Sequence, residues 1–213
     1  MNTIRSVALA SFAAVFVSGC YNYIDGGPQV SETRTVEGFD ALRVDDGFKV
    51  TWVKGAPQVV VDAPEKALEY LDTKVKNGRL TIELRNGVRV TNFDTIIITA
   101  SSESIDTFEA NGGSSIIAKD LSSNPLRVTA SGGSDIEVTG ASAELRVNAS
   151  GGSGVNAAAF AAEEVSIDAS GGSTVAIQAL KSVVGTASGG STVTVTGGGD
   201  VSKFSTSGGS TLN

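Results

Sequence analysis

Apolar and polar residues alternate over most of the chain after residue 100. Leu126, Val128 and Ala130 show this pattern, and Ile136 and Val138 resume it after a short polar interruption. Alternation with a period of two predicts β-strands that bury one face and expose the other. Each interruption is rich in glycine, so the pattern predicts a strand, a tight corner and a second strand in succession.

The interruptions are tetrads that recur at nearly constant spacing. Each reads Ser-Gly-Gly-Ser, except that the first begins with Asn111, and successive first glycines lie 18 to 20 residues apart. A fixed period of this length predicts a solenoid in which every repeat forms one coil. The predicted corner residues are Gly112, Gly113, Gly132, Gly133, Gly151, Gly152, Gly171, Gly172, Gly189, Gly190, Gly208 and Gly209.

We expect an all-β fold, a parallel β-helix with coils of about 19 residues. The corner glycines would permit a positive φ where a Cβ atom would clash. The small residue before each tetrad, such as Ala130, should face inward where two walls converge. Adjacent coils should lie about 4.8 Å apart. The last serines of the tetrads should then form one row, namely Ser114, Ser134, Ser153, Ser173, Ser191 and Ser210.

Three alternative structures fit the repeat less well. A flexible linker would not carry alternating valine, isoleucine and leucine through every repeat. A leucine-rich repeat has a similar period, but its leucine and asparagine signature is missing here. An array of βαβ units would need most of each repeat for the crossover alone.

The segment before residue 100 fits the solenoid less regularly and should supply its first coils and an N-terminal cap. Pro64, followed by Leu68 and Leu71, predicts one short helix between strands. Trp52 and Tyr70 are assigned to core and cap packing. The strands of this segment are expected within residues 39–44, 48–53, 58–61, 80–84 and 96–100.

The first twenty residues have the form of an export leader. Arg5 precedes an apolar stretch over residues 7–17, which is too short to span a bilayer. The segment that ends in Ser18-Gly19-Cys20 resembles a lipobox, the signal at which a peptidase cuts before a diacylated cysteine. Cys20 is the only cysteine of the chain, so we predict lipidation of Cys20 and no disulfide.

This leader sets the predicted domain organisation. Residues 1–19 are assigned to a signal peptide, residues 20–33 to a flexible tether and residues 34–213 to the β-helix domain. Acyl chains on Cys20 would attach the protein to a membrane. Tyr21 rather than aspartate follows Cys20, which implies the outer membrane under the enterobacterial sorting rule. Surface and periplasmic exposure both stay open.

Composition excludes several partners and chemistries. The formal net charge is −7, the pI is about 4.6 and histidine is absent, so we expect no nucleic acid partner. We predict no cofactor and no metal, because the segment nearest to a calcium nonapeptide has Asn156 where aspartate is required.

Thr192, Thr194 and Thr196 resemble a threonine row of ice-binding solenoids. We expect no such row on successive coils.

An envelope enzyme is the alternative, since parallel β-helices include polysaccharide lyases and hydrolases. Asp135 and Glu137 point the same way from one predicted strand and are the candidate acid/base pair. We interpret the pair as surface charge and predict no catalytic residue, because the equivalent positions of later repeats lack carboxylates. Those positions are Gly154, Asn156, Thr174, Ala176, Thr192 and Thr194.

Residues 37–44 (EGFDALRV), 50–55 (VTWVKG) and 77–82 (NGRLTI), with the later tetrads, resemble the head GIN domain family. This family carries the label of an autotransporter adhesin domain, and the resemblance covers residues 33–213. It implies a right-handed β-helix, export, frequent lipidation and adhesion, with no binding residues to carry over. Family members often have Ser-Gly-Ser-Gly tetrads, so the residue that presents the corner hydroxyl stays open.

The sequence therefore predicts a lipid-anchored protein of the cell envelope that acts as a non-catalytic adhesin-like or structural binding module. A polysaccharide-active β-helix enzyme is the alternative. The expected partners are a membrane, reached through the acyl chains, and glycans or proteins that contact the solenoid surface.

Overall fold

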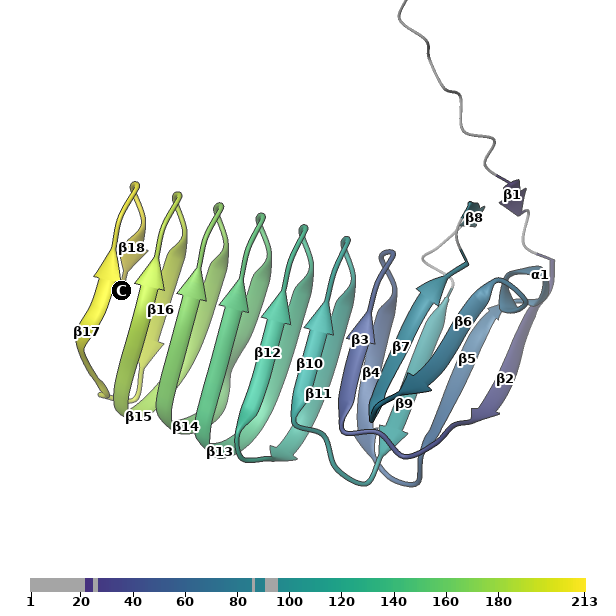
Figure 1. Cartoon of the computed structure of the whole chain (residues 1–213), viewed down its shortest axis with the longest axis horizontal. Helices are drawn as coiled ribbons and strands as arrows, with labels where there is room; N and C mark the ends of the chain where they lie inside the picture. Colours follow the sequence, from purple (N-terminus) through teal and green to yellow (C-terminus); the bar gives the residue numbers. More distant parts are fainter. Residues whose placement is uncertain (1–21, 25–26, 86, 91–95) are drawn as a thin grey trace, which may run out of the picture.

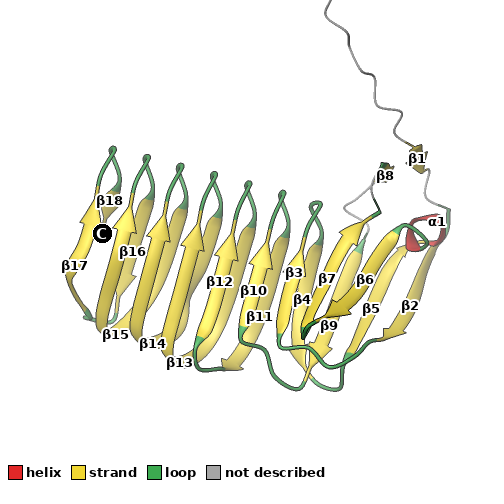
Figure 2. Ribbon diagram, in the orientation of Figure 1, coloured by secondary structure: helices red, strands yellow, loops and turns green. Residues whose placement is uncertain are grey.

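The computed structural model describes residues 22–24, 27–85, 87–90 and 96–213, so the leader and Cys20 lie outside the described residues. The described chain forms a β-solenoid of about five turns, with 66% of residues in strands and 2% in helix (Figure 2). The predicted all-β solenoid fold is confirmed.

The regular coils consist of two walls joined by the glycine corners (Figure 1). We call the wall that precedes each corner the first wall and the wall that follows it the second wall. The first wall contains β10 (Thr107–Ala110), β12 (Leu126–Ala130), the C-terminal parts of β13 (Asp135–Ala149), β14 (Gly154–Ala169) and β15 (Thr174–Ala187), and β17 (Asp200–Thr206). The second wall contains β11 (Ser115–Ser122), the N-terminal parts of β13, β14 and β15, β16 (Thr192–Thr196) and β18 (Thr211–Leu212).

Successive coils stack in register through parallel strand pairs. Ala110 pairs with Ala130, which pairs in turn with Ala149. A Cβ atom built on Gly151 would lie 3.2 Å from the nitrogen of Gly132, so these two corners occupy adjacent rungs, as predicted. The twelve corner glycines have φ values between 60° and 82°, which confirms the positive φ expected for them.

Alternation along each wall strand places apolar side chains in one continuous core. Phe108 and Phe160 are fully buried, and the strands between them alternate buried and exposed residues. Small residues occupy the positions next to the corner, where the two walls meet most closely. The alanines at these positions are at most 2% exposed, as expected: Ala110, Ala130, Ala149, Ala169 and Ala187.

The N-terminal part extends the same sheet but does not follow chain order. β3 (Ala41–Val44) and β4 (Lys49–Lys54) form a first coil, on which β10 and β11 stack from one side. β7 (Arg79–Leu84) and β9 (Ile97–Ser102) pair with β3 and β4 from the other side. The chain therefore builds the outer end of the cap before it returns, through residues 103–106, to start the regular coils.

Antiparallel strands close this end of the solenoid. β5 (Gln58–Pro64) pairs with β9 and with β2 (Gln29–Thr35), and β6 (Leu71–Lys76) pairs with β7. The helix α1 (Glu65–Leu68) joins β5 to β6. β1 (Asn22–Ile24) and β8 (Val88–Val90) form a separate two-stranded parallel sheet.

Two predictions for this region need correction. The tether predicted for residues 20–33 is wrong from Gln29 onward, because β2 pairs with β5 over its whole length. The predicted helix ends at Leu68 instead of reaching Leu71, which is buried and opens β6. In both segments, pairing with another strand overrides the local sequence signal: β2 pairs with β5, and β6 forms a hairpin with β7.

Trp52 and Tyr70 occupy different environments. Trp52 is 4% exposed and its ring meets that of Phe108 edge to face, with centroids 6.2 Å apart, so its assignment to the core is confirmed. Tyr70 lies half-buried just after α1, and the guanidinium of Arg85 lies 6.0 Å from its ring centroid. Tyr70 thus belongs to the cap surface rather than to the core.

Candidate functional site

The six glycine corners form a ridge along one edge of the solenoid (Figure 1). We call the twelve glycines of the tetrads the corner ridge; all of them are exposed. Backbone hydrogen bonds link its rungs, as in the 2.9 Å bond from the N–H of Gly152 to the carbonyl of Gly171. The corner ridge is therefore a straight strip of exposed, ordered backbone with no side chains of its own.

The predicted row of last serines exists, but it faces the interior. Five of these serines are at most 1% exposed. The Ser134 hydroxyl donates to the carbonyl of Ser131 at 2.7 Å and accepts from the N–H of Ser114 in the preceding coil at 3.2 Å. Each hydroxyl thus forms hydrogen bonds with backbone groups on the inner side of the corner, which fits the rule that buried polar atoms find partners.

The hydroxyls at the surface come from the first residue of each tetrad. These side chains are half-buried or exposed and continue along the first wall beside the corner ridge. This answers the question that the sequence left open, because the first serine and not the last presents the corner hydroxyl. We call this set the hydroxyl row; it consists of Asn111, Ser131, Ser150, Ser170, Ser188 and Ser207.

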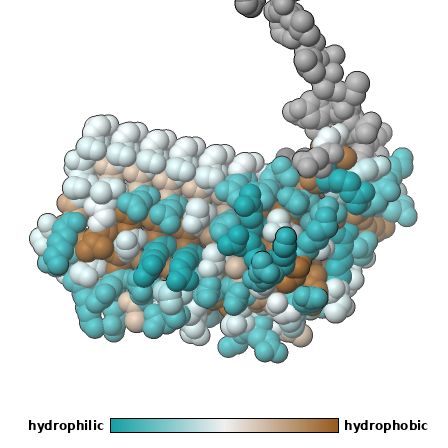
Figure 3. All heavy atoms as spheres, viewed as in Figure 1, coloured by the Kyte–Doolittle hydropathy of each residue, from teal (hydrophilic) through white to brown (hydrophobic). Residues whose placement is uncertain are grey.

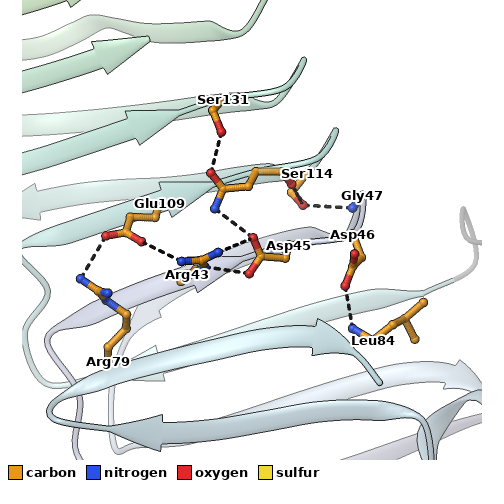
Figure 4. Close-up of polar contacts among 10 residues, drawn as sticks. Arg43, Asp45, Asp46, Gly47, Arg79, Leu84, Glu109, Ser114 and Ser131 are labelled. Carbon is orange, nitrogen blue, oxygen red and sulfur yellow. Dashed lines mark hydrogen bonds and ion pairs between the residues drawn. The ribbon is translucent and has the colours of Figure 1, made fainter. Parts of the chain in front are cut away.

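A polar network joins the hydroxyl row to the cap (Figure 4). The Ser131 hydroxyl donates to the Asn111 side-chain oxygen at 2.7 Å, and the Asn111 amide donates to Asp45 at 2.9 Å. Arg43 donates to the same carboxylate at 2.8 Å, and this hydrogen bond raises the pKa of the Arg43 guanidinium. Glu109 lies 3.0 Å from Arg79 and 4.0 Å from Arg43.

Asp45 belongs to a seventh corner that sequence reasoning missed. Residues 45–48 align with the first tetrad, since β3 pairs with β10 and β4 with β11. Asp46 and Gly47 have φ values of 63° and 83°, and Phe48 takes the place of the buried serine. The Asp-Gly dipeptide between two predicted strands was the available signal, because aspartate is among the few residues that tolerate this conformation.

Asp135 and Glu137 lie exposed on the outer face of the second wall, as predicted. With Asn156 and Thr174 they line a shallow groove that extends over four coils, from β11 to β15. Gly154 lies beside Asp135, and a Cβ atom there would come within 2.3 Å of the Asp135 carboxylate oxygen. This groove therefore collects short polar side chains from several coils rather than two facing carboxylates.

As predicted, the row of Thr192, Thr194 and Thr196 does not repeat on successive coils of this face, although its first position does. Thr174 pairs in register with Thr192, which pairs with Thr211. At the next outward position, however, Ala176 pairs with Thr194. The threonines therefore form a single column, which is narrower than the two-dimensional array of an ice-binding face.

The polar surface is mixed in character. On the face seen in Figure 3, the corner ridge is a band of near-neutral residues above interspersed hydrophilic and hydrophobic side chains. Among the described residues, no three His, Cys, Asp or Glu side chains are grouped so that they could bind a metal ion. No helix in the described part of the chain has the length and apolar character needed to cross a membrane.

Comparison with known proteins assigns the fold to a family. The family model described as "Putative auto-transporter adhesin, head GIN domain" matches residues 38–199. The chain belongs to this family. The matched part of the head GIN domain includes the seventh corner and five of the six tetrads. A comparison with curated proteins finds no match.

Several solved structures share the fold of this head GIN domain. A "putative adhesin" from Bacteroides fragilis has a TM-score of 0.73 at 15% identity, over 87% of this chain and 96% of its own. A "putative adhesin" from Parabacteroides merdae has a TM-score of 0.54 at 17% identity, over 89% and 98%. A "putative lipid binding protein" from Parabacteroides distasonis also scores 0.54 at 17% identity, over 90% and 99%. At these identities the likeness extends to the fold alone.

Proposed function

We propose that this head GIN domain is the exposed part of a lipid-anchored envelope protein and acts as a non-catalytic, adhesin-like contact module. The observation that carries the proposal is the rigid, in-register polar surface along the coils. The corner ridge and the hydroxyl row repeat one short polar pattern over successive coils. A partner would make several weak, equivalent contacts, and many anchored copies would add avidity.

The family and its solved relatives support a binding role over catalysis, since the family and two of the similar structures carry the name of adhesins. The surface chemistry agrees with that role. Serine hydroxyls, the Asn111 amide and the Asp45 carboxylate of the corner network are short hydrogen-bonding groups that match glycan hydroxyls or protein backbone. Glycan or protein ligands at the cell envelope are therefore the proposed partners.

The proposed anchor is Cys20, and membrane fractionation tests it directly. The full chain should sediment with membranes, and Cys20→Ala should move it to the soluble fraction while its circular dichroism stays unchanged. Ser18→Ala is the matched control, because it keeps a small residue before Cys20 and should leave the protein on the membrane. Sedimentation of Cys20→Ala with membranes would refute lipid anchoring.

A further inference from the structure

A cleft lies at the edge of the solenoid opposite the corner ridge, where the cap meets the regular coils. One hollow, with a cavity volume of about 270 Å³, lies between Trp52 and the return that follows β11. A second hollow adjoins it, and the two share Asp40, Glu103 and Ser104. We call the two together the junction cleft.

The cleft is a consequence of the chain order. The segment from β9 to β10 has to pass beneath the first coil, because β9 and β10 stack on opposite sides of it. Figure 1 shows this connection at the lower edge of the solenoid. On the far side, β11 itself leaves the regular register between Ala118 and Leu121, just before the return begins. In the next coil, by contrast, Gly140 packs so closely on Leu121 that no Cβ atom would fit.

The wall of the cleft is rigid. The Trp52 indole donates to the Ser102 hydroxyl at 2.9 Å, and that hydroxyl donates to the carbonyl of Ser104 at 2.8 Å. Phe108 packs against the Trp52 ring from the core side. Ile105 and Leu121, both buried, also line the hollow. Because these side chains are already held in one conformation, a ligand that binds there does not pay the entropy cost of immobilising them.

Two features of the return indicate a polar occupant. The Ser123 hydroxyl oxygen is shielded from solvent and has no hydrogen-bond partner in the described chain, a state that is unfavourable for a buried polar atom. Asp120 has a φ of 55°, a conformation that non-glycine residues seldom adopt. Both residues line the same hollow, which therefore has polar as well as apolar lining residues.

The charges around the cleft define the class of ligand. Its described lining includes the carboxylates of Asp40, Glu103, Asp106 and Asp120, against the single ammonium of Lys54. A cation is therefore favoured. Because the carboxylates form no group suited to a metal ion, the cation should be organic. The volume is close to the lower limit of about 300 Å³ for small-molecule sites, which suits one side chain.

We propose that the junction cleft binds a basic side chain, lysine or arginine, of a partner protein. The aliphatic stem lies against Trp52, Ile105 and Leu121, and the charged head reaches Asp106 and Asp120. This assigns a discrete, charge-selective site to a surface that otherwise offers weak repeated contacts. The inference does not depend on the lipid anchor or on the adhesin-like role.

Trp52 is the sole tryptophan of the chain, so its fluorescence and its indole N–H resonance report on the cleft. The full chain is titrated with Nα-acetyl-lysine methylamide, with the arginine analogue, and with the norleucine analogue, which has a similar stem but no charge. We expect the lysine and arginine probes to shift both signals and norleucine to have no effect. Equal responses to norleucine, or no response to any probe, would overturn the proposal. Stronger binding of glucosamine than of the lysine probe would also overturn it, because the ligand would then be an amino sugar.

Two matched double variants distinguish binding in the cleft from non-specific attraction to the negative charge of the protein. Asp106→Asn with Asp120→Asn removes two charges and keeps the shapes, since asparagine also tolerates the left-handed backbone of residue 120. We expect lysine-probe affinity to fall at least about tenfold. The control, Asp135→Asn with Glu137→Gln, removes two charges from the second wall and should leave the affinity unchanged. Equal losses in both pairs would show non-specific attraction and would contradict the site.

Discussion

The regular coils and the first coil turn the same corner with different residues. In the regular coils, a Cβ atom on the first glycine of a tetrad would point at the corner of the preceding coil. At Gly151, for example, it would lie 3.2 Å from the nitrogen of Gly132. Asp46 occupies this position in the first coil. Its carboxylate accepts a hydrogen bond from the N–H of Leu84, at the end of β7, at 2.9 Å. At the first glycine of each tetrad, the residue is thus required by stacking rather than by the conformation of the corner alone.

The two regions also differ in what stabilises them. The cap relies on specific side chains: Arg34 donates to the carbonyl of Leu68 and pairs with Glu32, so it ties β2 to the end of α1. The coils rely on repeated backbone contact, small residues at the corners and buried serines. Coils should therefore be intolerant of added atoms, whereas the cap should be sensitive to the loss of particular groups.

The largest effect is expected at Gly185, inside β15. A Cβ atom there would lie 1.9 Å from the carbonyl oxygen of Ile167, so Gly185→Ala must force the two coils apart. We expect a loss of about 3 kcal/mol or more in the free energy of unfolding, measured by urea denaturation. Gly152→Ala is the control, because its Cβ would meet nothing within 4 Å. Equal losses in the two variants would contradict the stacking argument.

Gly152→Val tests the backbone conformation of the corner rather than its space. Gly152 has a φ of 76°, which a β-branched residue adopts only with strain. We expect Gly152→Val to lose about 2 kcal/mol and Gly152→Asn clearly less, since asparagine tolerates positive φ. Thermal unfolding followed by circular dichroism measures both. Unchanged stability of the valine variant would rule out this corner geometry.

Ser153→Ala separates the buried serines from the hydroxyl row. The Ser153 hydroxyl accepts from the N–H of Ser150 at 3.0 Å and donates to the carbonyl of Ala130 at 2.9 Å. The N–H of Ser150 and the carbonyl of Ala130 also bond to each other at 3.0 Å, so removal of the hydroxyl chiefly deprives the carbonyl of Ser150 of the donor that lies 2.8 Å away. We therefore expect a loss of about 1–2 kcal/mol in a denaturant titration. Ser150→Ala, at the surface of the same corner, should change stability by less than about 0.5 kcal/mol. A larger loss at Ser150 would reverse the assignment of the two serines.

The smallest effect concerns Asp72 of the cap strand β6. Lys74 donates to its carboxylate at 2.7 Å and Arg85 at 3.4 Å, and chiefly the Lys74 hydrogen bond lowers the pKa of Asp72. A lowered pKa stabilises the fold above the ordinary value of the group. That contribution is lost as pH falls through about 4 toward the folded-state value. Because the pair is solvated, Asp72→Asn should remove only a few tenths of a kcal/mol at pH 7.

Chemical denaturation at pH 7 and pH 3 measures this contribution. The difference between wild type and Asp72→Asn should be present at pH 7 and should be smaller at pH 3. Asp135→Asn provides the comparison in the coils, because Asp135 is an exposed carboxylate on β13, outside the cap. A difference for Asp72→Asn that grows at low pH would contradict the sign of the argument.

The coils could be predicted closely because their signals are local and repeated. Alternation in every strand and the tetrad spacing led to the fold, the corner glycines and the inward alanines such as Ala130. The burial of Ser153 could not be derived, because both serines of a tetrad are equally polar. The choice between them depends on which hydroxyl reaches the backbone groups inside the corner.

The cap was harder to predict because its order in space departs from its order in sequence. Nothing local places β3 between β7 and β10, or pairs residues 29–35 with β5. The Asp46-Gly47 dipeptide was a local signal for the seventh corner, but the hydrogen bond that Asp46 accepts from Leu84 of β7 could not be foreseen from it. The junction cleft follows from this arrangement and was equally hidden from a linear sequence analysis.

The measurement that tests the proposed contact role most directly is incubation of the purified full chain with envelope polysaccharides. Pull-down should show glycan retained, and an assay for reducing ends should show no increase over buffer. Release of reducing ends by the wild type, and loss of that release in Asp135→Asn with Glu137→Gln, would show that the second-wall groove is an enzyme site and contradict the proposed function.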